Sequence, residues 1–278
     1  MTSSRSFVPA VERMTASADA EPEKWAFVLH GVFGSGRNWQ LFCRSIARRR
    51  PEWGFLLVDQ RGHGDSMGAT PPDTVEAMAE DLLALETELG RSVTGVIGHS
   101  LGGKVALAYA ARRADELDEV WILDSQPGAR EESPQAATRQ AMAALRRLPD
   151  RFDDRDAFVS EVTGMGQPKP IAQWLAMNLR PADGGMRLNL ELDRIAAILA
   201  DYFRRDLWAE LERLDDRRRL HVVVAGASTT WSGDDRDRLE AIAAQNAAVV
   251  PHLIEGAGHW VHVDAADAVR QLFIDELG

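Results

Sequence analysis

A serine in a glycine-framed turn is the strongest chemical signal in the sequence. Residues 98–103 read Gly-His-Ser-Leu-Gly-Gly, which sets Ser100 in the pattern Gly-x-Ser-x-Gly between an apolar run and a predicted helix. Such a turn exposes the serine hydroxyl above a sheet. It also puts the N–H of Leu101 at a helix N-terminus, where it can stabilise an oxyanion. The pattern indicates nucleophilic attack by Ser100 on a carbonyl carbon.

A histidine and an aspartate elsewhere in the chain can activate this serine. His259 follows the last predicted strand in a glycine-flanked loop, and Asp124 ends the fourth apolar run. His259 would take the proton of Ser100, and Asp124 would orient the imidazole. Asp234 and Asp235 are the competing acids because they follow the fifth apolar run. We favour Asp124 because it ends the strand next to that of the nucleophile.

A second glycine-rich turn follows the first predicted strand. It reads His-Gly-Val-Phe-Gly over residues 30–34, and its glycines let the backbone N–H groups turn inward. Val32 or Phe33 is expected to supply the second oxyanion donor, and the sequence does not choose between them. His99 and Trp260 adjoin the serine and the histidine and are expected to support the site.

The serine turn also has a rival interpretation. Residues 98–104 fit Gly-x-x-x-x-Gly-Lys, the start of a phosphate-binding loop. The next residue is Val105, where such a loop needs Ser or Thr to bind magnesium, so nucleotide binding is disfavoured.

Short apolar runs alternate with helical patterns after residue 24. This alternation predicts a mostly parallel sheet with helices on both faces. The strands are expected over 25–30, 54–58, 93–97, 120–123, 221–225 and 248–254, and the helices over 37–49, 74–89, 101–113, 235–246 and 265–277.

The alternation breaks over residues 126–219, which show helical patterns and no convincing strand. We interpret this segment as a helical cap inserted after Asp124 into a core formed by 25–125 and 220–278, with 1–24 as an N-terminal extension or hairpin. Met142, Trp174 and Met177 in the cap are candidates for an apolar acyl pocket.

Composition excludes several classes of protein. The chain of 278 residues carries 32 Lys and Arg against 43 Asp and Glu, a net charge of −11, which disfavours nucleic acid and anionic membranes as partners. A single cysteine, Cys43, permits no internal disulfide and no cysteine-rich metal site. No apolar stretch approaches the ~20 residues of a membrane span, and residues 1–24 lack a secretory signal. We therefore expect a cytoplasmic protein.

Taken together, the two glycine-rich turns and the order Ser100, Asp124, His259 resemble the α/β-hydrolase superfamily. The chain is most similar to its branch of YbfF-type esterases and thioesterases. That resemblance implies an acid at Asp124 and a supporting serine in Gly-Ala-Ser, which is Ser228 here, near His259 or Asp124. A departure occurs at Gly62, where that branch usually has Asn.

The resemblance implies a serine hydrolase for short- to medium-chain carboxylic esters or thioesters, with a small acyl substrate as partner and neither metal nor organic cofactor. Carbon–carbon bond cleavage, lactone opening, perhydrolysis and aminopeptidase activity use the same residues and remain alternatives, as does a non-catalytic ligand receptor. The sequence carries no signal for the oligomeric state.

Overall fold

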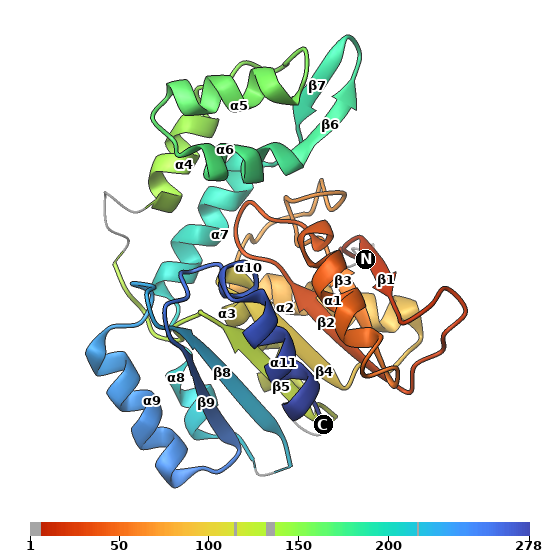
Figure 1. Cartoon of the computed structure of the whole chain (residues 1–278), viewed down its shortest axis with the longest axis vertical. Helices are drawn as coiled ribbons and strands as arrows, with labels where there is room; N and C mark the ends of the chain where they lie inside the picture. The colour runs from red at the N-terminus through yellow and green to blue at the C-terminus, as the bar shows by residue number, and fades with distance from the viewer. Residues whose placement is uncertain (1–6, 114–115, 132–136, 216) are drawn as a thin grey trace, which may run out of the picture.

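A seven-stranded sheet forms the centre of the molecule (Figure 1). The computed structural model describes residues 7–113, 116–131, 137–215 and 217–278. The strand order is β1-β3-β2-β4-β5-β8-β9, with β1 antiparallel to β3 and every other pair parallel. The strands are β1 Val11–Met14, β2 Lys24–Leu29, β3 Trp53–Val58, β4 Gly95–His99, β5 Glu119–Leu123, β8 Arg219–Ala225 and β9 Val249–Ile254. The prediction of a mostly parallel sheet is confirmed, and β1 adds an edge strand from the N-terminal segment.

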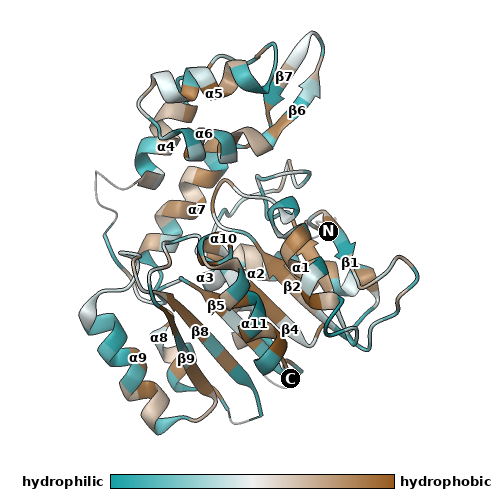
Figure 2. Ribbon diagram, viewed as in Figure 1, coloured by the Kyte–Doolittle hydropathy of each residue, from teal (hydrophilic) through white to brown (hydrophobic). Residues whose placement is uncertain are grey.

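Helices cover both faces of this sheet. Helices α1, α10 and α11 contribute to the core on one face, and α2, α3, α8 and α9 contribute to the core on the other. The central strands are buried along their whole length and lie in the brown interior of Figure 2, because both of their faces meet helices. The core helices are α1 Gln40–Ala47, α2 Val75–Leu89, α3 Leu101–Arg112, α8 Trp208–Glu212, α9 Gly233–Gln245, α10 Val261–Asp264 and α11 Ala266–Glu276, with a 3-10 turn at Gly36–Trp39.

The part of the chain from α4 to α7, between β5 and β8, rises above the C-terminal ends of the strands, whereas α8 returns to the sheet (Figure 1). It contains α4 Ala137–Leu145, α5 Arg155–Gly164, α6 Lys169–Leu175, a 3-10 turn at Ala176–Asn178, β6 Leu179–Ala182, β7 Gly185–Leu188 and α7 Leu192–Arg204. The expectation of a strand-free segment was wrong, because β6 and β7 form an antiparallel hairpin. The hairpin turns at Asp183-Gly184, where Gly184 has φ 78°, and Asp-Gly is a common hairpin-turn pair.

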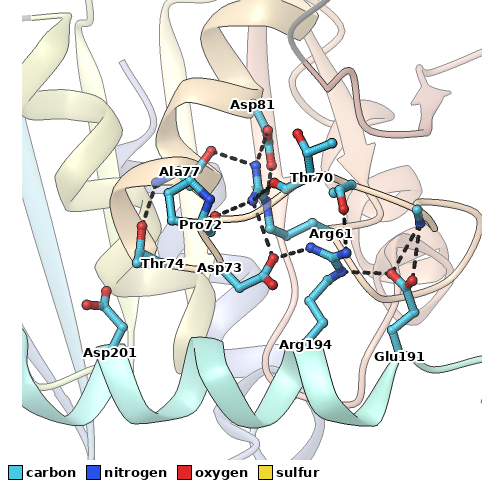
Figure 3. A network of polar contacts seen from close by, with 12 residues as sticks. Arg61, Thr70, Pro72, Asp73, Thr74, Ala77, Asp81, Glu191, Arg194 and Asp201 are labelled. Atoms are coloured by element: carbon cyan, nitrogen blue, oxygen red, sulfur yellow. Dashed lines mark hydrogen bonds and ion pairs between the residues drawn. The ribbon is translucent and has the colours of Figure 1, made fainter. Parts of the chain in front are cut away.

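Charged side chains fasten α7 to the core (Figure 3). Arg194 on α7 pairs with Asp73 from the core and with Glu191, 2.9 Å away. Asp73 also lies 3.5 Å from the guanidinium of Arg61, which makes two 2.6 Å hydrogen bonds to the carboxylate of Asp81. These residues are largely buried, so each charge depends on its partners.

A buried lysine holds the other end of α7. The ammonium group of Lys104 is fully buried and donates to the carbonyls of Gly128 at 2.7 Å and of Tyr202 and Arg205 at 2.8 Å. Its three donors are thus occupied inside the protein. The phosphate-loop interpretation fails for this reason, since that loop needs a lysine free to reach a phosphate.

Residues 137–188, which we call the outer cap, have a hydrophobic core of their own. Its members are Phe33, Ala141, Met142, Leu145, Phe152, Phe158, Val162, Ala172, Leu175, Ala176 and Leu179, joined by Ile195 and Leu199 of α7. Phe33 is the one member from the glycine-rich turn after β2. The outer cap therefore rests on that turn. In the described ranges, no helix is both long and apolar enough to cross a bilayer.

Candidate active site

Ser100 stands at the tight junction between β4 and α3. Its backbone adopts φ 53° and ψ −116°, a conformation that residues with side chains rarely take. The flanking glycines make the junction possible. A Cβ on Gly98 would lie 2.1 Å from the carbonyl oxygen of Gly102, and one on Gly102 would lie 2.5 Å from that of Leu29. The turn lifts the half-buried Ser100 side chain above the end of the sheet.

His259 reaches Ser100 from the loop between β9 and α10. Its Nε2 lies 3.0 Å from Ser100 Oγ, and its Nδ1 lies 2.7 Å from Asp124 Oδ2. A carboxylate can only accept, so Nδ1 carries the proton and Nε2 is left to accept the proton of the serine hydroxyl. The three side chains form one continuous chain of hydrogen bonds. The His259 side chain is 40% exposed, whereas that of Asp124 is fully buried.

Asp124 directly follows β5 with φ 43°, another left-handed backbone conformation. Its carboxylate accepts bonds from the Ala225 N–H at 3.2 Å and from Ser228 Oγ at 2.5 Å, besides that of His259. These donors offset the cost of burying the group. Ser228 thus contacts Asp124, as the sequence resemblance implied.

Thr230 is a neighbour of the site that sequence reasoning missed. Its Oγ1 lies 3.0 Å from Ser228 Oγ and 3.2 Å from His259 Nδ1. The only signal for it was its place two residues after Ser228, in a loop without a motif of its own.

The competing acids do not reach the histidine. Asp235 lies in the first turn of α9, where its carboxylate accepts from the Ser232 hydroxyl at 2.7 Å and from Gln126 Nε2 at 2.9 Å. Asp234 is in the same turn and is exposed. Both acids therefore serve the beginning of α9, where the helix dipole favours negative charge.

The turn at residues 31–34, which we call the oxyanion turn, lies against the serine. A Cβ on Gly31 would lie 3.3 Å from Ser100 Cβ. The N–H of Phe33 donates to His63 Nε2 at 3.2 Å and so is occupied. The N–H of Val32 has no acceptor among the described residues, and the N–H of Leu101 begins α3, where no helical acceptor exists. Of the three candidate donors, Val32 and Leu101 therefore keep a free N–H, while that of Phe33 is occupied.

His63 can accept this bond because it is neutral. Burial, reinforced by the nearby His30, lowers the pKa of His63 to about 3. Its Nδ1 lies 3.1 Å from the carbonyl of Arg61, which fixes the proton on Nδ1 and leaves Nε2 as an acceptor.

His99 supports the loop that carries His259. Its Nε2 donates to the backbone carbonyl of His259 at 2.7 Å, and burial holds its pKa well below 6.5. His262 stacks on Trp39 with ring centroids 4.0 Å apart. His99 thus meets His259 both at its backbone carbonyl and at its ring, with ring centroids 4.8 Å apart.

Aromatic side chains from the outer cap, which we call the roof, meet the residues next to the site. Trp174 of α6 meets the Phe33 ring at 6.4 Å and the Trp260 ring at 5.4 Å, which brings both predicted tryptophans together. Met177 is half-buried, and its sulfur accepts from Asn38. Met142 differs from these, because it belongs to the buried core of the outer cap. Among the described residues, no group of three or more His, Cys, Asp or Glu side chains is arranged to hold a metal ion.

The sheet, the strained serine junction and the cap inserted after β5 define the α/β-hydrolase fold. The chain belongs to the alpha/beta hydrolase family, whose model matches residues 26–272. It is 30% identical to Esterase YbfF of Escherichia coli K12 over 263 residues, which cover 87% of this chain and 88% of that one. The resemblance to the YbfF-type branch and the expectation of an enzyme of this family are thereby confirmed.

A second sequence relative and one solved structure are also similar to this chain. The mouse protein described as "sn-1-specific diacylglycerol lipase ABHD11" is 29% identical over 240 residues, which cover 85% of this chain and 75% of that one. A solved structure described as a marine microorganism esterase superposes with a TM-score of 0.80 and 24% identity, over 97% of this chain and 99% of the other. The last comparison supports the fold.

Proposed function

We propose that this protein hydrolyses short- to medium-chain carboxylic esters and thioesters, with Ser100 as nucleophile, His259 as general base and Asp124 as the acid that orients it. The observation that carries the proposal is the hydrogen-bond chain from Ser100 Oγ through His259 to Asp124 Oδ2. It lies beside the two free N–H groups of Val32 and Leu101. A nucleophile, a base and two oxyanion donors are the parts that acyl transfer requires.

The geometry suggests the following sequence of steps. Ser100 Oγ attacks the acyl carbonyl while His259 Nε2 takes the hydroxyl proton, and the tetrahedral oxyanion accepts bonds from Val32 and Leu101. The intermediate collapses as the leaving alcohol or thiol takes the proton from His259. Water then attacks the acyl-enzyme with His259 again as base and releases the acid. The exposure of His259 leaves a path for that water.

The roof over the serine favours an apolar acyl group. The half-buried Trp174 and Trp260 supply aromatic surface, and the half-buried Val32 adds an aliphatic side chain. The relatives described as an esterase and a diacylglycerol lipase are consistent with acyl esters as the substrate class.

The first test is hydrolysis of 4-nitrophenyl esters from acetyl to palmitoyl, followed by acyl-coenzyme A thioesters and a diacylglycerol. Ser100→Ala should lower turnover by about 10⁴–10⁶-fold on every active substrate. Ser45→Ala is the matched control, since Ser45 lies in α1 and bonds only to its own helix at Phe42. Its turnover should equal that of the wild type.

The outcomes separate the alternatives. Turnover that survives Ser100→Ala would sink the mechanism. A folded wild-type protein without activity on any ester or thioester would instead favour lactones, carbon–carbon bonds, peptides or a receptor role.

A further inference from the structure

The oxyanion turn is bent into a conformation that its own residues do not favour. The N–H of Gly34 donates to the carbonyl of Gly31 at 3.0 Å, which closes a four-residue turn. Inside it Phe33 has φ 60°, in the left-handed region that residues with side chains avoid. Such a backbone persists only where the surroundings hold it. The direction of the Val32 N–H therefore depends on what holds Phe33.

Phe33 is held from two sides. On the core side its N–H donates to His63 Nε2 at 3.2 Å. On the cap side its carbonyl accepts from Asn178 Nδ2 at 2.7 Å, and its ring is buried in the core of the outer cap. The backbone N–H of Phe33 is thus bonded to the core, and its carbonyl is bonded to the outer cap.

Asn178 is in turn fixed by the outer cap. Its side chain is buried, and its Nδ2 makes a second hydrogen bond, to the carbonyl of Leu175 at 3.2 Å. Its own carbonyl accepts from the N–H of Asn189 at 3.0 Å. The amide that holds Phe33 is thus tied to the outer cap through Leu175 and to the segment that follows the outer cap through Asn189.

We propose that Asn178 is a positioning residue that makes the oxyanion site depend on the seating of the outer cap. With the cap seated, the Asn178 amide keeps Phe33 left-handed and the Val32 N–H directed at the oxyanion. With the cap displaced, the Phe33 carbonyl loses its donor and the turn is free to relax. This inference rests on the proposed hydrolysis at Ser100.

The test uses two variants that remove the donor in different ways. Asn178→Ala deletes the amide, while Asn178→Leu fills nearly the same volume without a donor and keeps the outer cap packed. Val162→Ala is the matched control, because Val162 is buried in the core of the outer cap while the Phe33 backbone hydrogen-bonds to His63 and Asn178. Turnover number and KM are measured on 4-nitrophenyl butyrate, together with Ki for butylboronic acid, whose serine adduct is tetrahedral.

We expect both Asn178 variants to lose about 10–100-fold in turnover number, with KM changed by less than about threefold, because a displaced donor acts on the transition state. Ki for the boronic acid should rise by a similar factor. Val162→Ala should stay within about twofold on both measures. An equal loss in Val162→Ala, or unchanged turnover in both Asn178 variants beside a Ser100-dependent wild type, overturns this inference alone. A wild type without Ser100-dependent turnover overturns the proposed function and this inference with it.

Discussion

Helix α7 and the outer cap both belong to the segment between β5 and β8, yet they meet the core through opposite kinds of contact. At one end of the helix Arg194 pairs with Asp73 (Figure 3). At the other end the carbonyls of Tyr202 and Arg205 accept hydrogen bonds from Lys104. The outer cap meets the oxyanion turn through aromatic rings and the Asn178 amide. Its Arg180 adds an ion pair of 3.7 Å to Asp65 of the core, which is exposed.

The two kinds of contact hold α7 and the outer cap with different rigidity. Buried ion pairs and a buried ammonium require fixed partners, so α7 holds one position on the core. Apolar contact is non-directional and tolerates sliding, which suits a roof that must admit a substrate. The Asn178 hydrogen bond adds direction to the contact between the outer cap and the oxyanion turn.

The largest expected effect comes from removing the lysine under α7. Lys104→Met leaves three buried carbonyls without their donor, so the free energy of unfolding should fall by about 3–5 kcal/mol. Urea denaturation measures this loss. The same substitution at Lys169, which is exposed on α6 of the outer cap, should change it by less than about 0.5 kcal/mol. Equal losses at the two positions would remove the distinction between the anchored helix and the outer cap.

Acid should weaken the support of the oxyanion turn. His63 ordinarily would have a pKa of 6.5, and in the fold it is lowered to about 3. The unfolded chain therefore takes up this proton first, so the stability that neutral His63 contributes is complete above pH 6.5 and is lost as the pH falls toward 3. At pH 5 the loss from this one group is about 2 kcal/mol.

His63→Gln isolates that contribution, because the glutamine oxygen can accept the Phe33 N–H and does not titrate. Unfolding free energies at pH 7.5 and pH 5 should differ by about 2 kcal/mol less in the variant than in the wild type. If the free energy of unfolding falls equally between pH 7.5 and pH 5 in the wild type and in His63→Gln, His63 does not cause the acid sensitivity.

A smaller effect is expected in the roof itself. Trp174→Leu removes apolar area between Phe33 and Trp260. KM should therefore rise about 3–10-fold for the longest 4-nitrophenyl ester that the wild type hydrolyses well, and KM for short esters should change little. Met142→Leu is the control, since this position is in the cap's own core and the swap conserves volume. A shift of chain-length preference in Met142→Leu, or none in Trp174→Leu, would assign the acyl pocket differently.

Local patterns predicted much of the fold. Each expected strand of the sheet is present, because a buried parallel strand needs a continuous apolar run and a surface helix needs apolar residues on one face. The β6–β7 hairpin was missed because its strands have four residues each and are only half-buried, so they carry little apolar signal.

The junction at Ser100 follows from the sequence alone. Glycine at positions 98 and 102 lets strand and helix approach closely, because a Cβ at either position would collide with the backbone. The sequence narrowed the acid to Asp124, Asp234 or Asp235, and the second oxyanion donor to Val32 or Phe33. Only the tertiary structure decided how these groups meet. The Asp235 carboxylate accepts hydrogen bonds from Ser232 and Gln126, and the Phe33 N–H donates to His63. Such pairings join residues far apart in the chain, where no local periodicity encodes the partner.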